Sequence, residues 1–128
     1  KILLTILSKI NMKTVDIFIP TINENVTFIV GKNAQDNTSI ILNATPDDIW
    51  FHVNNKSSCH VIALLSDLNI KIPRKNMKYI VKQGALLCKQ HSYPSEKNLD
   101  IIYTKVKNIE TTDIPGQVHT KECSNISI

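Results

Sequence analysis

The chain has 128 residues, a formal net charge of +4 at pH 7, 42% hydrophobic residues and 20% charged residues. This length predicts one domain, large enough to fold around its own core without disulfides or metal ions. The composition is that of an ordinary globular protein, and the sequence contains no repeat, low-complexity segment or coiled-coil tail.

The first eleven residues, KILLTILSKIN, form a segment that we treat as separate from the domain. Its apolar residues follow a helical spacing, but the run is shorter than the roughly 20 residues that span a bilayer. The segment also lacks the small-residue cleavage site of a signal peptide. We therefore expect no membrane contact, a natural start at Met12, and a domain that occupies residues 12–128.

Apolar runs predict two strands near the start of the domain, at residues 16–19 and 26–30, joined by an Asn-containing turn. Gly31 interrupts this pattern, and the following residues 33–43 predict a short helix that ends before Pro46. The first part of the domain is therefore expected to be a hairpin followed by a helix.

Two further strands are predicted at residues 49–53 and 59–64, joined by a turn that is rich in Asn and Ser. Alternation along the first of them places Trp50 and His52 on one face. His60 lies across the turn, so the two histidines are expected to be neighbours on adjacent strands.

The segment between Pro73 and Pro94 predicts the main helix of the domain. Its apolar residues recur at the i, i+3 and i+4 positions of one helical face. Gly84 lies in the middle of that face, where it costs about 1 kcal/mol relative to alanine. We interpret this glycine as a place where the helix backbone packs closely against a sheet.

Four more strands follow the helix, at residues 99–103, 106–109, 118–120 and 126–128, and Pro115-Gly116 marks a turn between them. Strands thus precede and follow one main helix. This order predicts an α+β fold, in which a largely antiparallel sheet is packed by one main basic amphipathic helix and a short helix.

Positive charge is concentrated in the main helix. Six Lys or Arg residues and no Asp or Glu lie between residues 71 and 92. At about 100° per residue, Lys75, Lys78, Lys82 and Lys89 fall within a strip roughly 60° wide. Such a strip is often a solvated face, but surfaces that serve only solubility mix both signs of charge. A strip without acidic neighbours suits phosphate groups.

Catalytic, metal and cofactor sites are not expected. No H-E-x-x-H or C-x-x-C motif is present, and the remaining histidines, His91 and His119, come from distant segments. Asp47 and Asp48 are adjacent rather than paired across a site, and the Gly-Lys pair at residues 31–32 lacks the spacing of a phosphate-binding loop. His52 and His60 remain open to two interpretations, as hydrogen-bonded histidines at the rim of the core or as part of a binding surface.

Three cysteines, Cys59, Cys88 and Cys123, are scattered along the chain. Their odd number and spacing indicate neither a zinc ribbon nor a disulfide framework. We interpret them as buried, reduced thiols of an intracellular protein.

Short motifs resemble those of the NFACT-R domain family, in the same order and spacing. They occur at residues 31–37 (GKNAQDN), 48–52 (DIWFH), 58–61 (SCHV), 103–104 (YT) and 115–118 (PGQV). The resemblance covers nearly the whole chain from about residue 15, and it is closest to the short members that carry this domain without the other NFACT parts.

The resemblance implies a non-catalytic, cytoplasmic RNA-binding module. In large members of the family this domain belongs to ribosome quality-control factors that engage tRNA, so tRNA, rRNA or the ribosome is the expected partner. The chain lacks the other parts of those factors, so their tailing activity is not expected of it. DNA remains an alternative because phosphate contacts alone do not distinguish the sugar, and Tyr79 and Leu86 beside the lysines are candidates for docking a protein.

The predicted nucleic-acid contacts combine cations for phosphates, amides for base edges, and rings that stack on unpaired bases. Capping of the following helix is an alternative for Asn33, and a place in the core is an alternative for Trp50. The predicted residues are Lys32, Asn33, Gln35, Trp50, His52, Lys56, His60, Arg74, Lys75, Lys78, Lys82 and Lys89.

Overall fold

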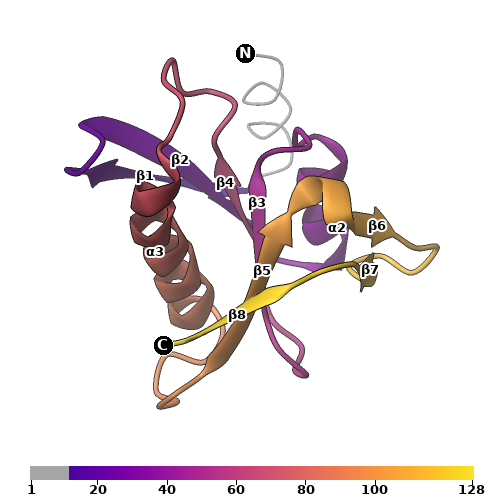
Figure 1. Cartoon of the computed structure of the whole chain (residues 1–128). Coiled ribbons are helices and arrows are strands. Elements are labelled where there is room, and N and C mark those ends of the chain that lie inside the picture. The colour runs from indigo at the N-terminus through magenta and orange to yellow at the C-terminus, as the bar shows by residue number, and fades with distance from the viewer. Residues whose placement is uncertain (1–11) are drawn as a thin grey trace.

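A computed structural model of the chain describes residues 12–128 (Figure 1). The prediction that residues 1–11 stand apart from the domain concerns residues outside this described part. The strands are β1 (Lys13–Ile19), β2 (Glu24–Val30), β3 (Ile49–Val53), β4 (Val61–Leu64), β5 (Asp100–Lys105), β6 (Ile109–Thr111), β7 (Val118–Thr120) and β8 (Ser124–Ser127). The α-helices are α2 (Ala34–Leu42) and α3 (Met77–Gln90), and single 3₁₀ turns occur at η1 (Arg74–Asn76) and η2 (Val106–Asn108).

Six strands form one antiparallel sheet in the order β1-β2-β4-β3-β5-β8, and β6 and β7 form a separate two-stranded sheet. The α+β class, the largely antiparallel sheet, the main helix and the short helix are therefore confirmed. β1 and β8 are the edge strands of the large sheet in the described part of the chain.

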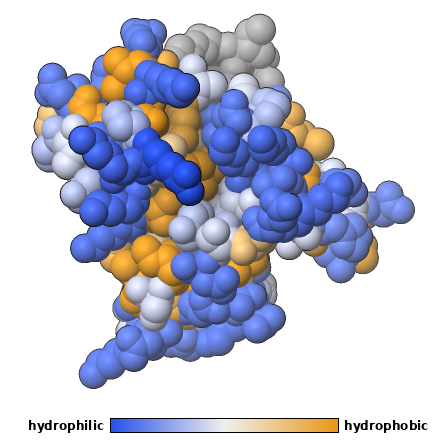
Figure 2. Space-filling view, in the orientation of Figure 1, coloured by the Kyte–Doolittle hydropathy of each residue, from blue (hydrophilic) through white to orange (hydrophobic). Residues whose placement is uncertain are grey.

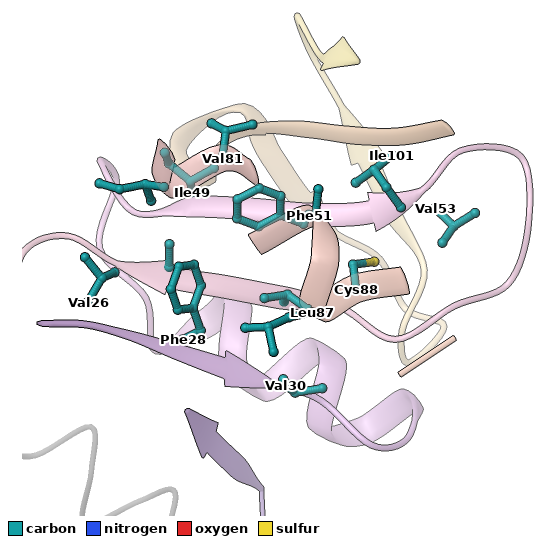
Figure 3. Packing of buried hydrophobic residues seen from close by; sticks show 14 of the residues in the cluster. Val26, Phe28, Val30, Ile49, Phe51, Val53, Val81, Leu87, Cys88 and Ile101 are labelled. Carbon is teal, nitrogen blue, oxygen red and sulfur yellow. The ribbon is translucent and has the colours of Figure 1, made fainter. Parts of the chain in front are cut away.

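The large sheet is covered on both faces. α3 lies across one face, and α2 with the β6–β7 pair lies on the other (Figure 1). Alternation along β3 sends Ile49, Phe51 and Val53 into the core beneath α3, part of which Figure 3 shows. Trp50 points to the opposite face and packs there with the apolar side of α2. Because both faces are covered, four of the five residues of β3 are buried.

Gly84 explains how closely α3 approaches the sheet. A methyl group at this position would overlap the ring of Phe51, which is fully buried in β3. The prediction that this glycine permits close packing of the helix backbone is confirmed.

Several predicted strands differ from the structure in their bounds, and two of them do so because their backbones bond elsewhere. β4 begins at Val61 rather than Cys59, since the amides of Cys59 and His60 donate to the side chains of Ser92 and Asn37 at 3.2 Å each. The predicted strand at 106–109 begins instead as the turn η2, because the amide of Val106 donates to the carbonyl of Asp48 at 2.8 Å.

Asp48 holds the start of β3 in place. Its carboxylate is fully buried and accepts hydrogen bonds from the backbone amides of Thr45 at 2.9 Å, Leu65 at 2.9 Å and Ser66 at 3.1 Å. A buried carboxylate is tolerated when hydrogen bonds replace its water. Asp48 thereby ties the loop before β3 to the end of β4.

Candidate nucleic-acid interface

The outer face of α3 and the turn before it carry exposed cations. Arg74 and Lys75 lie in η1, and Lys78 and Lys82 lie on the first two turns of α3. No ion pair between described residues involves any of these four side chains. This end of the predicted strip is therefore a group of exposed cations without acidic partners. We call these four residues the α3 cation group.

Lys89 differs from the α3 cation group. It lies in the last turn of α3, is half-buried, and donates from Nζ to the carbonyl oxygen of Ile128 at 3.1 Å. The predicted strip thus extends over the first half of the helix, and its C-terminal member contacts the segment that follows β8.

Hydrophobic side chains interrupt the cations on the same surface. Tyr79 and Leu86 are 40% and 38% exposed, and Phe18 on neighbouring β1 is 51% exposed. In Figure 2 the surface over α3 accordingly mixes hydrophilic and hydrophobic residues. Lys78 Nζ also lies 5.2 Å from the centre of the Tyr79 ring, a distance at which a cation is attracted to an aromatic face.

A polar cleft of about 650 Å³ forms a second candidate surface. Its walls come from segments that are far apart in the sequence, namely residues 30–34, 57–60 and 115–117, with single side chains from α2, β3 and the end of α3. Four predicted contacts, Lys32, Asn33, His52 and His60, line it. Four of the five motifs that carry the family resemblance therefore contribute to this cleft, all but the one at residues 103–104. The sequence predicted only a turn at residues 115–116 and no part in binding. We call this space the motif cleft.

Asn33 and Asn37 line the motif cleft, and their side chains accept hydrogen bonds from backbone amides around it. Asn33 is the N-cap of α2, where its Oδ1 accepts from the amide of Asp36 at 2.9 Å, so the capping role left open by the sequence is the one observed. Asn37 is buried and its Oδ1 accepts from the amide of His60 at 3.2 Å. A side chain at Gly31 would overlap Asn37, which explains the glycine at this point.

Gly116 attaches the last wall of the motif cleft to α2. Its backbone has a φ of 80°, a conformation that favours glycine, and its amide donates to Thr38 Oγ1 at 2.8 Å. The Pro-Gly-Gln motif thus positions a loop rather than supplying charge.

Trp50, His52 and His60 form one cluster, and its two histidines line the motif cleft. Trp50 is 1% exposed and donates from Nε1 to His60 Nδ1 at 3.1 Å. The His52 ring stacks on the indole with 5.6 Å between ring centres and 8° between planes. Trp50 and His60 therefore belong to the core, the alternative that the sequence left open for Trp50. Of the three residues, only His52 is partly exposed.

His60 is uncharged at neutral pH. Its Nδ1 accepts the Trp50 hydrogen bond, so its proton lies on Nε2. Burial, together with repulsion from His52, lowers the pKa of His60 to about 3, against the opposing effect of a backbone hydrogen bond to Gly116. Burial also lowers the pKa of His52, although the bond between Nδ1 and the Val53 carbonyl opposes this. The histidines thus add no positive charge to the motif cleft.

Lys56 forms an ion pair with Glu96, so it is less available to contact a phosphate than predicted. Its Nζ lies 2.6 Å from Glu96 and 4.8 Å from the centre of the Tyr93 ring. Both charged side chains are about two-fifths exposed, so the pair sits at the surface. Among the remaining predicted contacts, Lys32 and Gln35 are exposed near the start of α2.

Within residues 12–128, no group of three or more His, Cys, Asp or Glu side chains is arranged to hold a metal ion. In the same part of the chain, each helix is too short or too polar to cross a membrane.

A family model described as the NFACT protein RNA binding domain matches residues 15–122. Among curated proteins, the chain is 32% identical over 92 residues to coiled-coil domain-containing protein 25 of Mus musculus, a match that covers 67% of this chain and 41% of the mouse protein. The homolog of Dictyostelium discoideum is 33% identical over 87 residues, which cover 65% of this chain and 40% of that protein. The chain thus matches about two-fifths of the length of these relatives.

One similar solved structure is the C-terminal part of the fibronectin/fibrinogen-binding protein from Streptococcus suis. It superimposes with a TM-score of 0.68 and 19% sequence identity, over 84% of this chain and 42% of that chain. At this identity the likeness concerns the fold.

Proposed function

Because this chain belongs to the family of NFACT protein RNA-binding domains, we propose that it is a non-catalytic module that binds structured RNA in the cytoplasm, such as tRNA or rRNA on the ribosome. Membership of the family supports a role in nucleic-acid binding. The kind of RNA, the ribosome as its location and the absence of catalysis belong to the proposal.

The α3 cation group is the observation that carries the proposal. Four exposed cations lie on one helix and the turn before it, and within residues 12–128 no carboxylate forms an ion pair with them. Cations in this state release the counterions of a nucleic acid when they approach its phosphates, which favours binding. A salt bridge already formed in the free protein would have to break first, as for Lys56 and Glu96.

The motif cleft supplies a second kind of contact. Lys32 and the partly exposed His52 line it, and the exposed Gln35 follows its lining residue Ala34 in the chain. An amide and a neutral ring suit a base or a ribose better than a phosphate, because they carry no charge. In this proposal the α3 cation group supplies most of the affinity, and the motif cleft contacts an unpaired nucleotide.

The decisive experiment measures RNA affinity against salt concentration for paired charge reversals. Changing Lys78→Glu and Lys82→Glu together should weaken binding to all RNA sequences. For a duplex it should also reduce the slope of log K against log salt by about 1.8, which is two contacts at about 0.9 each. The control is Lys97→Glu with Lys107→Glu, which changes the net charge equally at two other exposed lysines. Equal effects of the two pairs would contradict a specific role for α3.

Competition of labelled RNA by unlabelled DNA of the same sequence tests the preference for RNA. If the protein contacts only phosphates, unlabelled DNA displaces the labelled RNA as well as unlabelled RNA does. If it also contacts the 2′-hydroxyl, DNA is the weaker competitor. Equal competition by DNA and RNA would show that the ligand is nucleic acid in general rather than RNA. Cosedimentation with ribosomes, before and after nuclease treatment, then tests whether the ribosome is the site of binding.

Protein docking is a second candidate function, favoured by the exposed rings and side chains beside the lysines. A groove of about 570 Å³ runs between β1 and α3, lined by Val15, Ile17, Leu86 and Pro94 among others. A partner that binds there should remain bound after nuclease treatment and in high salt, and Leu86→Ser should release it. Loss of the partner with nuclease would instead indicate that RNA links the two.

A further inference from the structure

Two cysteines from distant parts of the chain meet at the wall of the motif cleft. Cys59 precedes β4 and Cys88 lies in the last two turns of α3. The thiol of Cys59 donates to the carbonyl of Cys88 at 3.6 Å, and the thiol of Cys88 donates to the carbonyl of Cys59 at 3.8 Å. Each sulfur therefore lies against the backbone of the other residue, and both are free thiols.

The two thiols differ in access. Cys59 is partly exposed and lines the motif cleft, so a small reagent in the cleft lies next to this residue. Cys88 is fully buried in the core beneath α3, where Figure 3 shows its sulfur among apolar side chains. A reagent thus meets Cys59 first, and Cys88 is in position to react only with a group already formed on Cys59.

Ser92 prepares the sulfur of Cys59 for attack. Its hydroxyl donates to Cys59 Sγ at 3.2 Å while its oxygen accepts from the amide of the same cysteine at 3.2 Å. Hydrogen bonds from Cys88 and Ser92 stabilise a thiolate, and they lower the pKa of Cys59 to about 7 against the opposing effect of burial. The hydrogen bond with Cys59 and, to a smaller extent, burial raise the pKa of Cys88. The thiolate is the reactive form of cysteine.

We propose that Cys59 is a site of oxidation by hydroperoxides, and that Cys88 then converts the product to an intramolecular Cys59–Cys88 disulfide. The inference does not depend on RNA binding.

The chemistry proceeds in two balanced steps. The Cys59 thiolate attacks the terminal oxygen of the hydroperoxide, so that a sulfur–oxygen bond forms, the oxygen–oxygen bond breaks, and the alkoxide leaves and takes a proton from water to become an alcohol. The Cys88 sulfur then attacks the sulfur of the sulfenic acid as it loses its proton. A disulfide forms and the hydroxyl group leaves as water. Two thiols are oxidised by two electrons, and the hydroperoxide is reduced to an alcohol and water.

Cys123 provides an internal control. It is also a free cysteine with partial exposure, but within residues 12–128 no thiol partner or sulfur hydrogen bond accompanies it. Hydrogen bonds from Cys88 and Ser92 favour the thiolate of Cys59, and the thiolate is the form that reacts with a hydroperoxide. The lower nucleophilicity of the more acidic thiol offsets part of this advantage. Cys59 should therefore be oxidised several-fold faster than Cys123.

The test treats the purified chain with one equivalent of hydrogen peroxide, blocks remaining thiols with an alkylating reagent, and maps the peptides by mass spectrometry. We expect a Cys59–Cys88 linked peptide and an alkylated Cys123, with the link reversed by dithiothreitol. In Cys88→Ser, Cys59 should remain as a sulfenic acid that dimedone traps. Cys123→Ser should form the same disulfide as the unaltered chain.

Three results would overturn the proposal: oxidation of Cys123 as fast as Cys59, a disulfide between two chains, or no link in a protein that remains folded. Loss of the buried thiol in Cys88→Ser could unfold the chain, so dimedone is also added to the unaltered protein during oxidation. There it should trap Cys59 and reduce the yield of the disulfide in proportion, and an unchanged yield would exclude the sulfenic acid intermediate.

Discussion

The indole nitrogen of Trp50 in β3 donates to Nδ1 of His60, the residue before β4, at 3.1 Å, and both side chains are buried. This bond gives a structural role both to the only tryptophan of the chain and to the histidine of the motif at residues 58–61. It makes both residues part of the frame that holds the motif cleft, and it fixes the protonation state of the histidine.

Acid should destabilise the protein through His60. Its pKa is about 3 in the folded state and about 6.5 in the unfolded chain, so the unfolded state binds the proton more readily. The contribution of His60 to stability is therefore complete above about pH 6.5 and is lost as the pH falls from there toward 3. The slope approaches about 1.4 kcal/mol per pH unit within that window. Urea unfolding between pH 7.5 and pH 4.5 measures it.

The matched variants for this experiment are His60→Gln and His119→Gln. Glutamine at position 60 can still accept from Trp50 but does not titrate, so the dependence on pH should become shallower. His119 is exposed in β7, and its replacement should leave the dependence unchanged. An unaltered slope in His60→Gln would assign the effect to His52 or to the carboxylates.

Replacing Asp48 by asparagine should lower the free energy of unfolding by about 1–3 kcal/mol, because a buried acceptor of three amide hydrogens loses its charge and one of its oxygens. The neighbouring Asp47→Asn is the control. Asp47 is exposed and lies 3.4 Å from Lys105, so its change should stay within about 0.5 kcal/mol. Chemical denaturation of both variants decides whether Asp48 has the structural role assigned to it.

Gly84→Ala should destabilise the fold even though alanine favours helices by about 1 kcal/mol. The added methyl group overlaps the Phe51 ring, and overpacking of this kind costs about 1–3 kcal/mol. The double variant with Phe51→Leu, which removes part of the ring, should recover some of the loss relative to the sum of the single changes. Additive effects in this mutant cycle would show that the two positions do not contact each other.

Lys56→Ala should change RNA affinity less than Lys82→Ala. Lys56 is paired with Glu96 in the free protein, so its gain from a phosphate is reduced by the loss of that pair, whereas Lys82 has no acidic partner among the described residues. Removing the carboxylate with Glu96→Gln should free Lys56 and strengthen binding at low salt. Weaker binding in Glu96→Gln would contradict this account.

Local sequence patterns predicted the frame of this domain well. The alternation in residues 49–53 predicted which side chains lie on each face of β3, and the apolar spacing around Gly84 predicted both α3 and its close approach to the sheet. These features depend on neighbours within one or two turns of chain, where periodicity carries the information.

The pairing of charges could not be predicted in this way. Lys56 and Glu96 are 40 residues apart, and Lys89 reaches the carbonyl of Ile128 over 39 residues. Only the folded topology brings such partners together. The same holds for Cys59 and Cys88, which the sequence shows as two unrelated thiols 29 residues apart.

The assembly of the motif cleft from widely spaced segments has an evolutionary consequence. The α3 cation group comes from one continuous stretch of chain, so substitutions there can tune how tightly a ligand is held without disturbing the rest of the molecule. The cleft walls are joined at Gly31, Asn37 and Gly116. Gly31 and Gly116 donate from their backbone amides to the His60 carbonyl and the Thr38 hydroxyl, and the Asn37 side chain accepts from the His60 amide. Divergence in selectivity must therefore proceed through the few surface positions between these anchors.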